Sequence, residues 1–163
     1  MNQIHHHSTT QPSQHYRIAV VNAAWHGDIV MAPSTALRAE LAQHGVPDTH
    51  VIDYEVPGAF EIPLRARQII AATKPDAVVA CALVVDGGIY RHEFVASAVI
   101  DGLMRLQLDT GVPVFSAVLT PRDFHDHAEH QAFFKAHFVK KGVEVAQACL
   151  ATLEGLAALP SAA

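Results

Sequence analysis

The sequence predicts an α/β domain in which a parallel sheet lies between two layers of helices. The segment 77–94 (AVVACALVVDGGIYRHEF) begins with a continuous apolar run, which is typical of a strand buried on both faces. Strand-like and helix-like segments also alternate along the chain, as in parallel sheets whose strands are joined by crossover helices. We therefore expect a three-layer α/β/α sandwich with a four-stranded parallel sheet.

The composition is that of one globular domain. Half of the 163 residues are hydrophobic and 17% are charged, and we find no internal repeat or linker. The net charge of −5, without a basic stripe, argues against a nucleic-acid partner. The chain shows no signal peptide and no apolar run long enough for a membrane, so we expect a soluble cytoplasmic protein. Cys81 and Cys149 lack a C-x-x-C partner and are expected to be reduced packing residues.

The expected elements follow in order. Pro33 and Ser34 open a helix, because proline fits the first helical turn, and Gly45 ends it. Residues 123–137 are rich in His and Phe and are expected to be helical in part, and Gly142 lies near the start of the last helix. We expect strands at 17–22, 49–56, from 77 and at 112–119, and helices at 33–44, 63–73, 94–109 and 140–159.

Two tails are expected to flank a single domain at 17–158. Residues 1–16 are polar and carry three consecutive histidines, so we interpret them as a mobile tail. The alternative is that they order against a neighbouring subunit. Residues 159–163 form the C-terminal tail.

Three predicted strands end in loops with unusual chemistry, and parallel strands bring such ends to one edge of the sheet, where ligands bind. The first loop carries Trp25 and His26, and the second reads PGAFE at 57–61. Separately, the Trp and Phe could be packing residues and the Glu could favour a helix dipole. Together, aromatic faces, backbone amides and a carboxylate suit a planar heterocycle with N–H donors.

The third loop contains Gly87 and Gly88, followed by Arg91 and His92. Most Gly-Gly pairs are only turns, but glycines also let the backbone approach a ligand closely. The free N–H groups of the helix that follows favour an anion. Arg91 and His92 beside them would suit a phosphate group or a proton transfer.

A histidine cluster follows the fourth predicted strand. His127 and His130 are three residues apart, so a helix would place them on one face. The close ligand spacing of a zinc site, such as H-E-x-x-H, is absent and no cysteine is near. We therefore expect a solvated or interface role here and no metal site.

Four motifs together resemble the lumazine synthase family. They are VPGAFEIP at 56–63, VVDGG at 84–88, PV at 113–114 leading to LT at 119–120, and KGVE at 141–144. Their order and spacing match the family from about residue 17 to residue 153. Trp25-His26, where most of the family has Phe-Asn, and GGIYRH at 87–92 resemble the divergent second-type branch of rhizobia and their relatives.

The resemblance implies a flavodoxin-like fold and the penultimate step of riboflavin biosynthesis. In that step 5-amino-6-(D-ribitylamino)uracil condenses with 3,4-dihydroxy-2-butanone 4-phosphate to 6,7-dimethyl-8-ribityllumazine, phosphate and water. No metal or organic cofactor is expected. Catalysis would rest on the juxtaposition of the two substrates and on proton transfers.

The resemblance also assigns roles to residues at matching positions. Trp25 should stack on the pyrimidine ring, and residues 83–85 should offer backbone contacts. The full substrate-binding set is Trp25, His26, Ala59, Phe60, Glu61, Leu83, Val84, Val85 and Ser116, and the phosphate-binding set is Gly87, Gly88, His130 and Lys141.

Three positions depart from the family pattern. Ile89 stands where the family has a Thr in its phosphate loop. Arg91 falls at the position of the catalytic His, and His92 comes next, about 100° further round a helix, so both are candidate catalytic residues. At the family's phosphate-binding Arg, one alignment gives His130 and the other Phe133; only His130 could replace it chemically, and we expect weaker phosphate binding.

The family implies pentamers with active sites between neighbouring chains, and for this branch a decamer. The histidine-rich segment 123–137 would then be an interface that acid weakens. A competing interpretation is a lumazine- or flavin-binding protein with little synthase activity. A structural shell is a third interpretation, which would need an assembly larger than a decamer.

Overall fold

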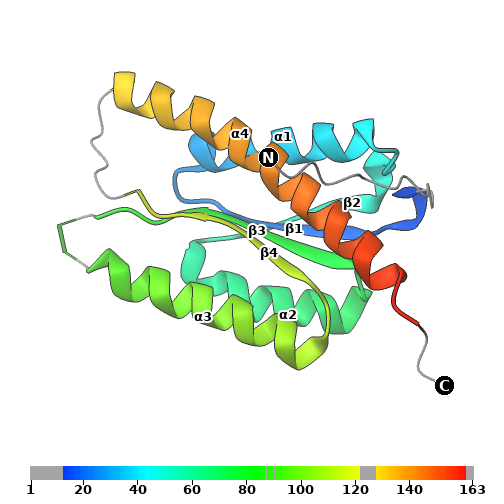
Figure 1. The fold of residues 1–163 in the computed structure, drawn as a ribbon. Coiled ribbons are helices and arrows are strands. Elements are labelled where there is room, and N and C mark those ends of the chain that lie inside the picture. The colour runs from blue at the N-terminus through cyan, green and yellow to red at the C-terminus, as the bar shows by residue number, and fades with distance from the viewer. Residues whose placement is uncertain (1–12, 87, 90, 122–127, 161–163) are drawn as a thin grey trace, which may run out of the picture.

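Four parallel strands form a single sheet (Figure 1). The computed structural model describes residues 13–86, 88–89, 91–121 and 128–160. The strands are β1 (Ile18–Ala23), β2 (Val51–Val56), β3 (Ala77–Leu83) and β4 (Val114–Leu119). Their order is β2-β1-β3-β4, the flavodoxin-like order in which the chain reverses direction from the first strand outward. The predicted four-stranded parallel sheet is confirmed.

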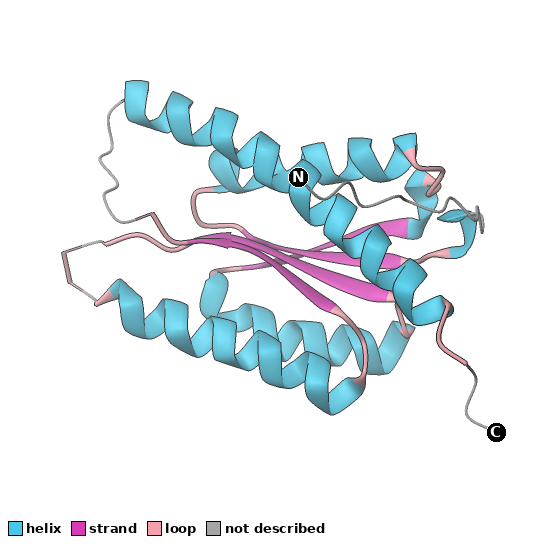
Figure 2. Cartoon of the chain, in the orientation of Figure 1, coloured by secondary structure: helices cyan, strands magenta, loops and turns pink. Residues whose placement is uncertain are grey.

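Helices cover both faces of this sheet (Figures 1 and 2). One face carries α1 (Gly27–Gln43) and α4 (Ala128–Ala157), and the other carries α2 (Ile62–Thr73) and α3 (His92–Thr110). Short 3-10 turns lie at Ser13–His15, Asp48–His50 and Ala59–Glu61. The three-layer sandwich is therefore also confirmed.

The two central strands explain the apolar run in the sequence. Every residue of β1 and of β3 is buried, because helices cover both faces and further strands cover both edges. Alternate side chains of β3 enter two separate cores: Val79 and Cys81 lie on the side of α1 and α4, and Val78 and Ala80 on the side of α2 and α3.

Both cysteines are free and lie in the core beneath α1 and α4. Burial away from water raises the pKa of the Cys81 thiol to about 12, and that of Cys149 likewise to about 12, because a thiolate is poorly solvated there. Their predicted role as packing residues is consistent with this burial.

The predicted start of the first helix is wrong. The helix α1 begins at Gly27, so Pro33 lies inside it rather than at its start. Proline cannot donate the hydrogen bond that a helix interior requires. Here the Pro33 carbonyl lies against Gly142 of α4, where a Cβ would be 2.3 Å from the carbonyl oxygen. Close packing of α1 against α4 thus keeps the segment around Pro33 helical, although proline locally favours an interruption of the helix.

The predicted start of the last helix is also wrong. The helix α4 begins at Ala128 instead of residue 140, so Gly142 lies near its middle. Phe138 is buried against the core and Phe134 packs beside it. The histidine- and phenylalanine-rich segment therefore extends the final helix, and its described part confirms the partial helix expected there.

Ordered structure begins before residue 17. The Ser13 hydroxyl donates a hydrogen bond to the His44 carbonyl, and Tyr16 packs against the core. Residues 1–12 of the predicted tail lie outside the described residues. No helix among the described residues is both long and apolar enough to cross a membrane.

Candidate active site

The loops that follow β1 and β2 are joined at the carboxyl edge of the sheet. The Ala24 amide donates to the Val56 carbonyl at 2.8 Å, and the Trp25 amide donates to the Pro57 carbonyl at 3.1 Å. The hydrogen-bond ladder of the two parallel strands thus continues past their ends. The sequence placed these loops at a common edge, and the structure brings them into direct contact.

The Trp25 indole lies on the backbone of Gly58. A Cβ on Gly58 would be 2.7 Å from both Cε3 and Cζ3 of the Trp25 ring. The indole is nevertheless 66% exposed, so most of its surface faces outward. A large aromatic side chain seated on one side and open on the other can stack on a planar ligand.

The neighbouring turn adds a second aromatic ring and a carboxylate. The Gly58 amide donates a hydrogen bond to Glu61 Oε2 at 3.0 Å, which closes the turn before α2. Phe60 is 64% exposed and Ala59 is buried. Ala59 therefore anchors the turn, while Phe60 and Glu61 present an aromatic face and an acceptor beside Trp25.

His26 links this loop to α1. It has left-handed backbone dihedral angles (φ 56°, ψ 36°), which are uncommon for a residue with a side chain. Its carbonyl accepts hydrogen bonds from the amides of Ile29 and Val30 at 2.9 and 3.0 Å. His26 therefore turns the chain from the Trp25 loop into the helix.

The end of β3 exposes fewer groups to a ligand than the sequence predicts. Leu83 and Val84 are buried and Val85 is half-buried. The Val84 amide already donates to the Leu119 carbonyl of β4 at 2.9 Å. Any contact from Leu83 or Val84 to a ligand must therefore come from the backbone groups that the sheet leaves open, whereas the Val85 side chain is partly accessible.

Ser116 does not lie at the carboxyl edge. It pairs with Ala80 in the middle of the sheet, whereas Leu119 pairs with Leu83 at the end of β3. Three residues of a strand span about 10 Å, which separates Ser116 from the loops described above. Its hydroxyl accepts a hydrogen bond from the Val118 amide at 3.3 Å.

In the loop between β3 and α3, Gly88 has a left-handed backbone conformation. Gly88 has a φ of +74°, a conformation that glycine adopts without a steric penalty. Its amide donates to Asp86 Oδ1 at 2.9 Å. Gly87, the other predicted phosphate-binding glycine, lies outside the described residues.

Arg91 and His92 stand at the start of α3 in two different backbone conformations. Arg91 precedes the helix (φ −75°, ψ 95°) and His92 is its first residue. The Arg91 guanidinium lies 4.8 Å from the centre of the Phe94 ring, a cation–π arrangement. His92 Nδ1 is 3.8 Å from Glu93 Oε2. A cation and an imidazole thus flank helix amides that favour an anion.

Lys141, a predicted phosphate-binding residue on α4, pairs with a neighbour on its own helix. Lys141 Nζ donates to Glu144 Oε2 on its own helix at 2.6 Å, and this hydrogen bond lowers the pKa of Glu144. Within the described residues, Lys141 makes no hydrogen bond or ion pair with the strand-end loops. His130 falls in α4, but its side chain lies outside the described residues.

The absence of a metal site is a prediction about the histidine cluster that follows β4. Residues 125–127 of that cluster and the side chains of residues 129 and 130 lie outside the described residues. Elsewhere among the described residues, no three His, Cys, Asp or Glu side chains gather closely enough to hold a metal.

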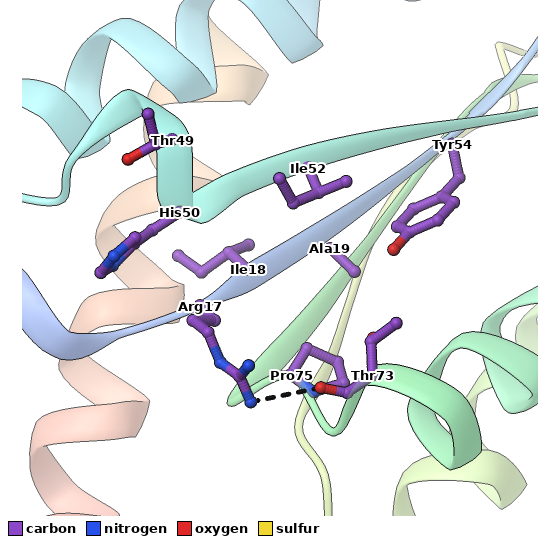
Figure 3. Close-up of a pocket in the computed structure, with 9 residues that line it drawn as sticks. All are labelled: Arg17, Ile18, Ala19, Thr49, His50, Ile52, Tyr54, Thr73 and Pro75. Atoms are coloured by element: carbon purple, nitrogen blue, oxygen red, sulfur yellow. Dashed lines mark hydrogen bonds between the residues drawn. The ribbon is translucent and has the colours of Figure 1, made fainter.

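Two hollows lie away from the carboxyl edge. One, of about 150 Å³, opens at the amino end of β1 and β2 and is lined by Arg17, His50, Ile52 and Tyr54, among others (Figure 3). There Arg17 Nη2 donates to the Thr73 carbonyl at 3.2 Å. The other, of about 430 Å³, lies between α2 and α3. Neither includes a residue of the Trp25 loop.

Two residues gain roles that the sequence did not suggest. Gly58 was interpreted only as part of a turn, yet it seats the Trp25 ring. Phe94 was interpreted only as the point where the helical pattern begins, yet it lies beneath the Arg91 guanidinium. Matching the ends of neighbouring parallel strands would have suggested the contact between Gly58 and Trp25. The three-residue spacing at a helix start would have suggested the contact between Arg91 and Phe94.

Comparison with known proteins shows which family the chain belongs to. The model of the 6,7-dimethyl-8-ribityllumazine synthase family matches residues 15–157. A 6,7-dimethyl-8-ribityllumazine synthase of Rhodococcus erythropolis is 56% identical over 148 residues, which cover 91% of this chain and 96% of the relative.

Two further relatives are named 6,7-dimethyl-8-ribityllumazine synthase 2. That of Bradyrhizobium diazoefficiens is 54% identical over 86% of this chain and 84% of its own length. That of Pseudomonas syringae is 47% identical over 93% of this chain and 88% of its own length. The resemblance to this family and to its second-type branch is confirmed, and the chain belongs to the 6,7-dimethyl-8-ribityllumazine synthase family.

Proposed function

We propose that this chain makes 6,7-dimethyl-8-ribityllumazine at the carboxyl edge of its sheet. It condenses 5-amino-6-(D-ribitylamino)uracil with 3,4-dihydroxy-2-butanone 4-phosphate, the penultimate step of riboflavin biosynthesis, as its family membership supports. The observation that carries the location is the Trp25 ring seated on Gly58 beside the turn of Phe60 and Glu61. Exposed aromatic surface and an acceptor meet at one place there.

The pyrimidine substrate binds at this pair of loops. Trp25 stacks on the heterocycle, because its indole is held on one side and open on the other. Phe60 offers a second apolar contact, and the Glu61 carboxylate accepts a hydrogen bond from a pyrimidine N–H. His26, Ala59 and the backbone of residues 83–85 complete this side of the site. Ser116 is not part of it, because it lies about three residues before the end of β4.

The phosphate substrate binds at the start of α3. Amides at a helix N-terminus favour an anion, and Gly88 lets the backbone approach it. The Arg91 guanidinium adds a charge-assisted contact. His92 is the group that moves protons during imine formation, phosphate elimination and ring closure.

The active unit is a homo-oligomer based on pentamers, with a decamer as the assembled form. Large apolar side chains are exposed on and before α3, including Ile89 at 87%, Met104 at 52% and Leu108 at 76%, and such side chains are typical of association surfaces. Lys141 and His130 then reach the phosphate site of a neighbouring chain, which accords with the lack of contact between Lys141 and the loops of its own chain.

We also propose that the protein works in the cytoplasm. A charged phosphate ester does not cross membranes freely, and two unpaired buried thiols suit a reducing compartment.

Lumazine formation by the purified protein tests this function. The two substrates are supplied together and the product is followed by its absorbance. We expect turnover by the wild type and by Gly155→Ala, a control on α4 where a Cβ meets nothing within 4 Å. Absence of product at saturating concentrations of both substrates, with tight flavin binding instead, would contradict the proposal.

A further inference from the structure

We infer that Gly58 is a specificity-determining position, because its missing side chain lets the Trp25 indole lie in its stacking orientation. The contact between the two residues stands on the structure alone. Its effect on the pyrimidine substrate rests on the proposed function.

The backbone at residue 58 does not require glycine. Its dihedral angles are φ −141° and ψ −179°, an extended conformation that any residue adopts. Gly88 and Gly111 differ in this respect, since their φ angles are +74° and +70°. What glycine supplies at position 58 is therefore free space and not conformational freedom.

The Trp25 ring occupies that space. A Cβ would be 2.7 Å from two ring carbons, closer than the 3.0 Å below which real Cβ contacts essentially never fall. It would also lie 3.2 Å from Glu61 Oε2, the oxygen that closes the turn. Trp25 is 66% exposed, so we expect an added methyl group to displace the indole toward solvent while the fold persists.

Displacement of the ring has a selective consequence. Stacking depends on the position and tilt of the indole, so the pyrimidine substrate loses affinity when the ring turns away. The phosphate substrate binds at the start of α3 and keeps its contacts. Gly58→Ala should therefore raise KM for the pyrimidine substrate and leave KM for the phosphate substrate nearly unchanged. A general loss of structure would impair the binding of both substrates.

The atoms in contact suggest a rescue. Cε3 and Cζ3 belong to the outer, benzene half of the indole, and a phenylalanine ring has no atoms there. Trp25→Phe should therefore make room for a methyl group on residue 58. If the contact is direct, Gly58→Ala should raise KM for the pyrimidine substrate strongly when residue 25 is tryptophan and only slightly when it is phenylalanine. A double-mutant cycle measures this difference.

The experiment compares the full-length wild type, Gly58→Ala, Trp25→Phe and the double variant. Gly155→Ala is the control glycine, since a Cβ there meets nothing within 4 Å. Trp25 is the only tryptophan, so the intrinsic fluorescence of the wild type and of Gly58→Ala reports on this ring directly. We expect Gly58→Ala to lower the anisotropy of that fluorescence and to increase its quenching by acrylamide.

In kinetics, we expect Gly58→Ala to raise KM for the pyrimidine substrate about tenfold, the loss of roughly one aromatic contact. We expect KM for the phosphate substrate to change less than about twofold. Between Trp25→Phe and the double variant, KM for the pyrimidine substrate should differ by less than about twofold.

Equal KM changes in the two backgrounds, or unchanged fluorescence in Gly58→Ala, would overturn the inference. If Gly58→Ala alone fails to fold, a folded double variant supports it and an unfolded double variant contradicts it. If the wild type makes no lumazine, the proposed function fails, whereas the fluorescence comparison still decides whether residue 58 controls the Trp25 ring.

Discussion

Gly142 and Gly58 are both glycines that leave no room for a methyl group, but they lie in very different surroundings. At Gly142, a Cβ would be 2.3 Å from the carbonyl oxygen of Pro33 and 2.9 Å from the Ala36 Cβ. At Gly58, a Cβ would be 2.7 Å from an exposed indole ring. The first neighbour is the backbone of α1 at its buried face, and the second is a side chain at the surface.

The difference separates the stability of the fold from the operation of the site. Because α1 and α4 are packed together over a continuous core, a methyl group on Gly142 must push two helices apart. The carboxyl edge is open, so a methyl group on Gly58 moves one ring. We expect substitutions at Gly142 to destabilise the fold and substitutions at Gly58 to alter ligand binding.

The largest expected effect is that of Gly142→Ala. Overpacking against backbone costs about 3 kcal/mol or more, and urea denaturation should show this loss of unfolding free energy. Gly155→Ala, on the exposed part of the same helix, should instead raise stability by about 0.5–1 kcal/mol, because alanine is the better helix former. If both variants are equally stable, the close contact between α1 and α4 is wrong.

Trp25→Ala should leave stability nearly unchanged and impair substrate binding, the opposite of Gly142→Ala. The side chain is mostly exposed, so its removal should change the unfolding free energy by no more than about 0.5 kcal/mol. KM for the pyrimidine substrate should rise by about tenfold to a hundredfold, as expected for the loss of stacking on a base. A large loss of stability with an unchanged KM would show that Trp25 is a packing residue.

Phe94→Leu should have a smaller effect on the same site. It removes the ring beneath the Arg91 guanidinium, a contact worth about 0.5–1 kcal/mol at an exposed position. We expect KM for the phosphate substrate to rise by about twofold to fivefold. An unchanged KM for the phosphate substrate would mean that the ring does not position Arg91.

The smallest expected effect is the contribution of the two cysteines to the pH dependence of stability, which is absent at neutral pH. Burial raises the pKa of Cys81 and of Cys149 from 9.0 to about 12. The folded state therefore holds these protons more tightly than the unfolded state, and their contribution to stability is complete below pH 9. That contribution is lost as pH rises from about 9 toward 12. Alkylation of the folded protein at pH 8 should be slow, and rapid labelling would contradict the burial.

The parts of the fold that could be predicted are those that depend on local pattern. The apolar run of β3 and the alternation of strands and helices were sufficient for the parallel sheet. The start of α1 was missed because Pro33 favours a break locally, while its contact with Gly142 depends on a segment more than a hundred residues away. The glycine at 142 locally favours a helix end, but its packing against Pro33 keeps it inside α4.

The candidate site likewise has residues that the sequence could predict and contacts that it could not. Trp25, Phe60, Glu61, Arg91 and His92 follow strand ends, and topology alone brings such residues to one edge. Ser116 was placed there by its motif, but the register of β4 puts it about three residues from the end of the strand. The seating of Trp25 on Gly58 depends on the hydrogen bonds between two loops, which no local pattern specifies.

The most direct test of the central claim, that the carboxyl edge carries the chemistry, is the rate of lumazine formation by the wild type, Arg91→Ala and His92→Ala. We predict an active wild type, a higher KM for the phosphate substrate in Arg91→Ala, and a kcat lower by about 10²-fold or more in His92→Ala, as for a lost acid–base group. Circular dichroism should show all three to be folded. Wild-type rates in both variants would contradict the account, since the reaction would then take place elsewhere.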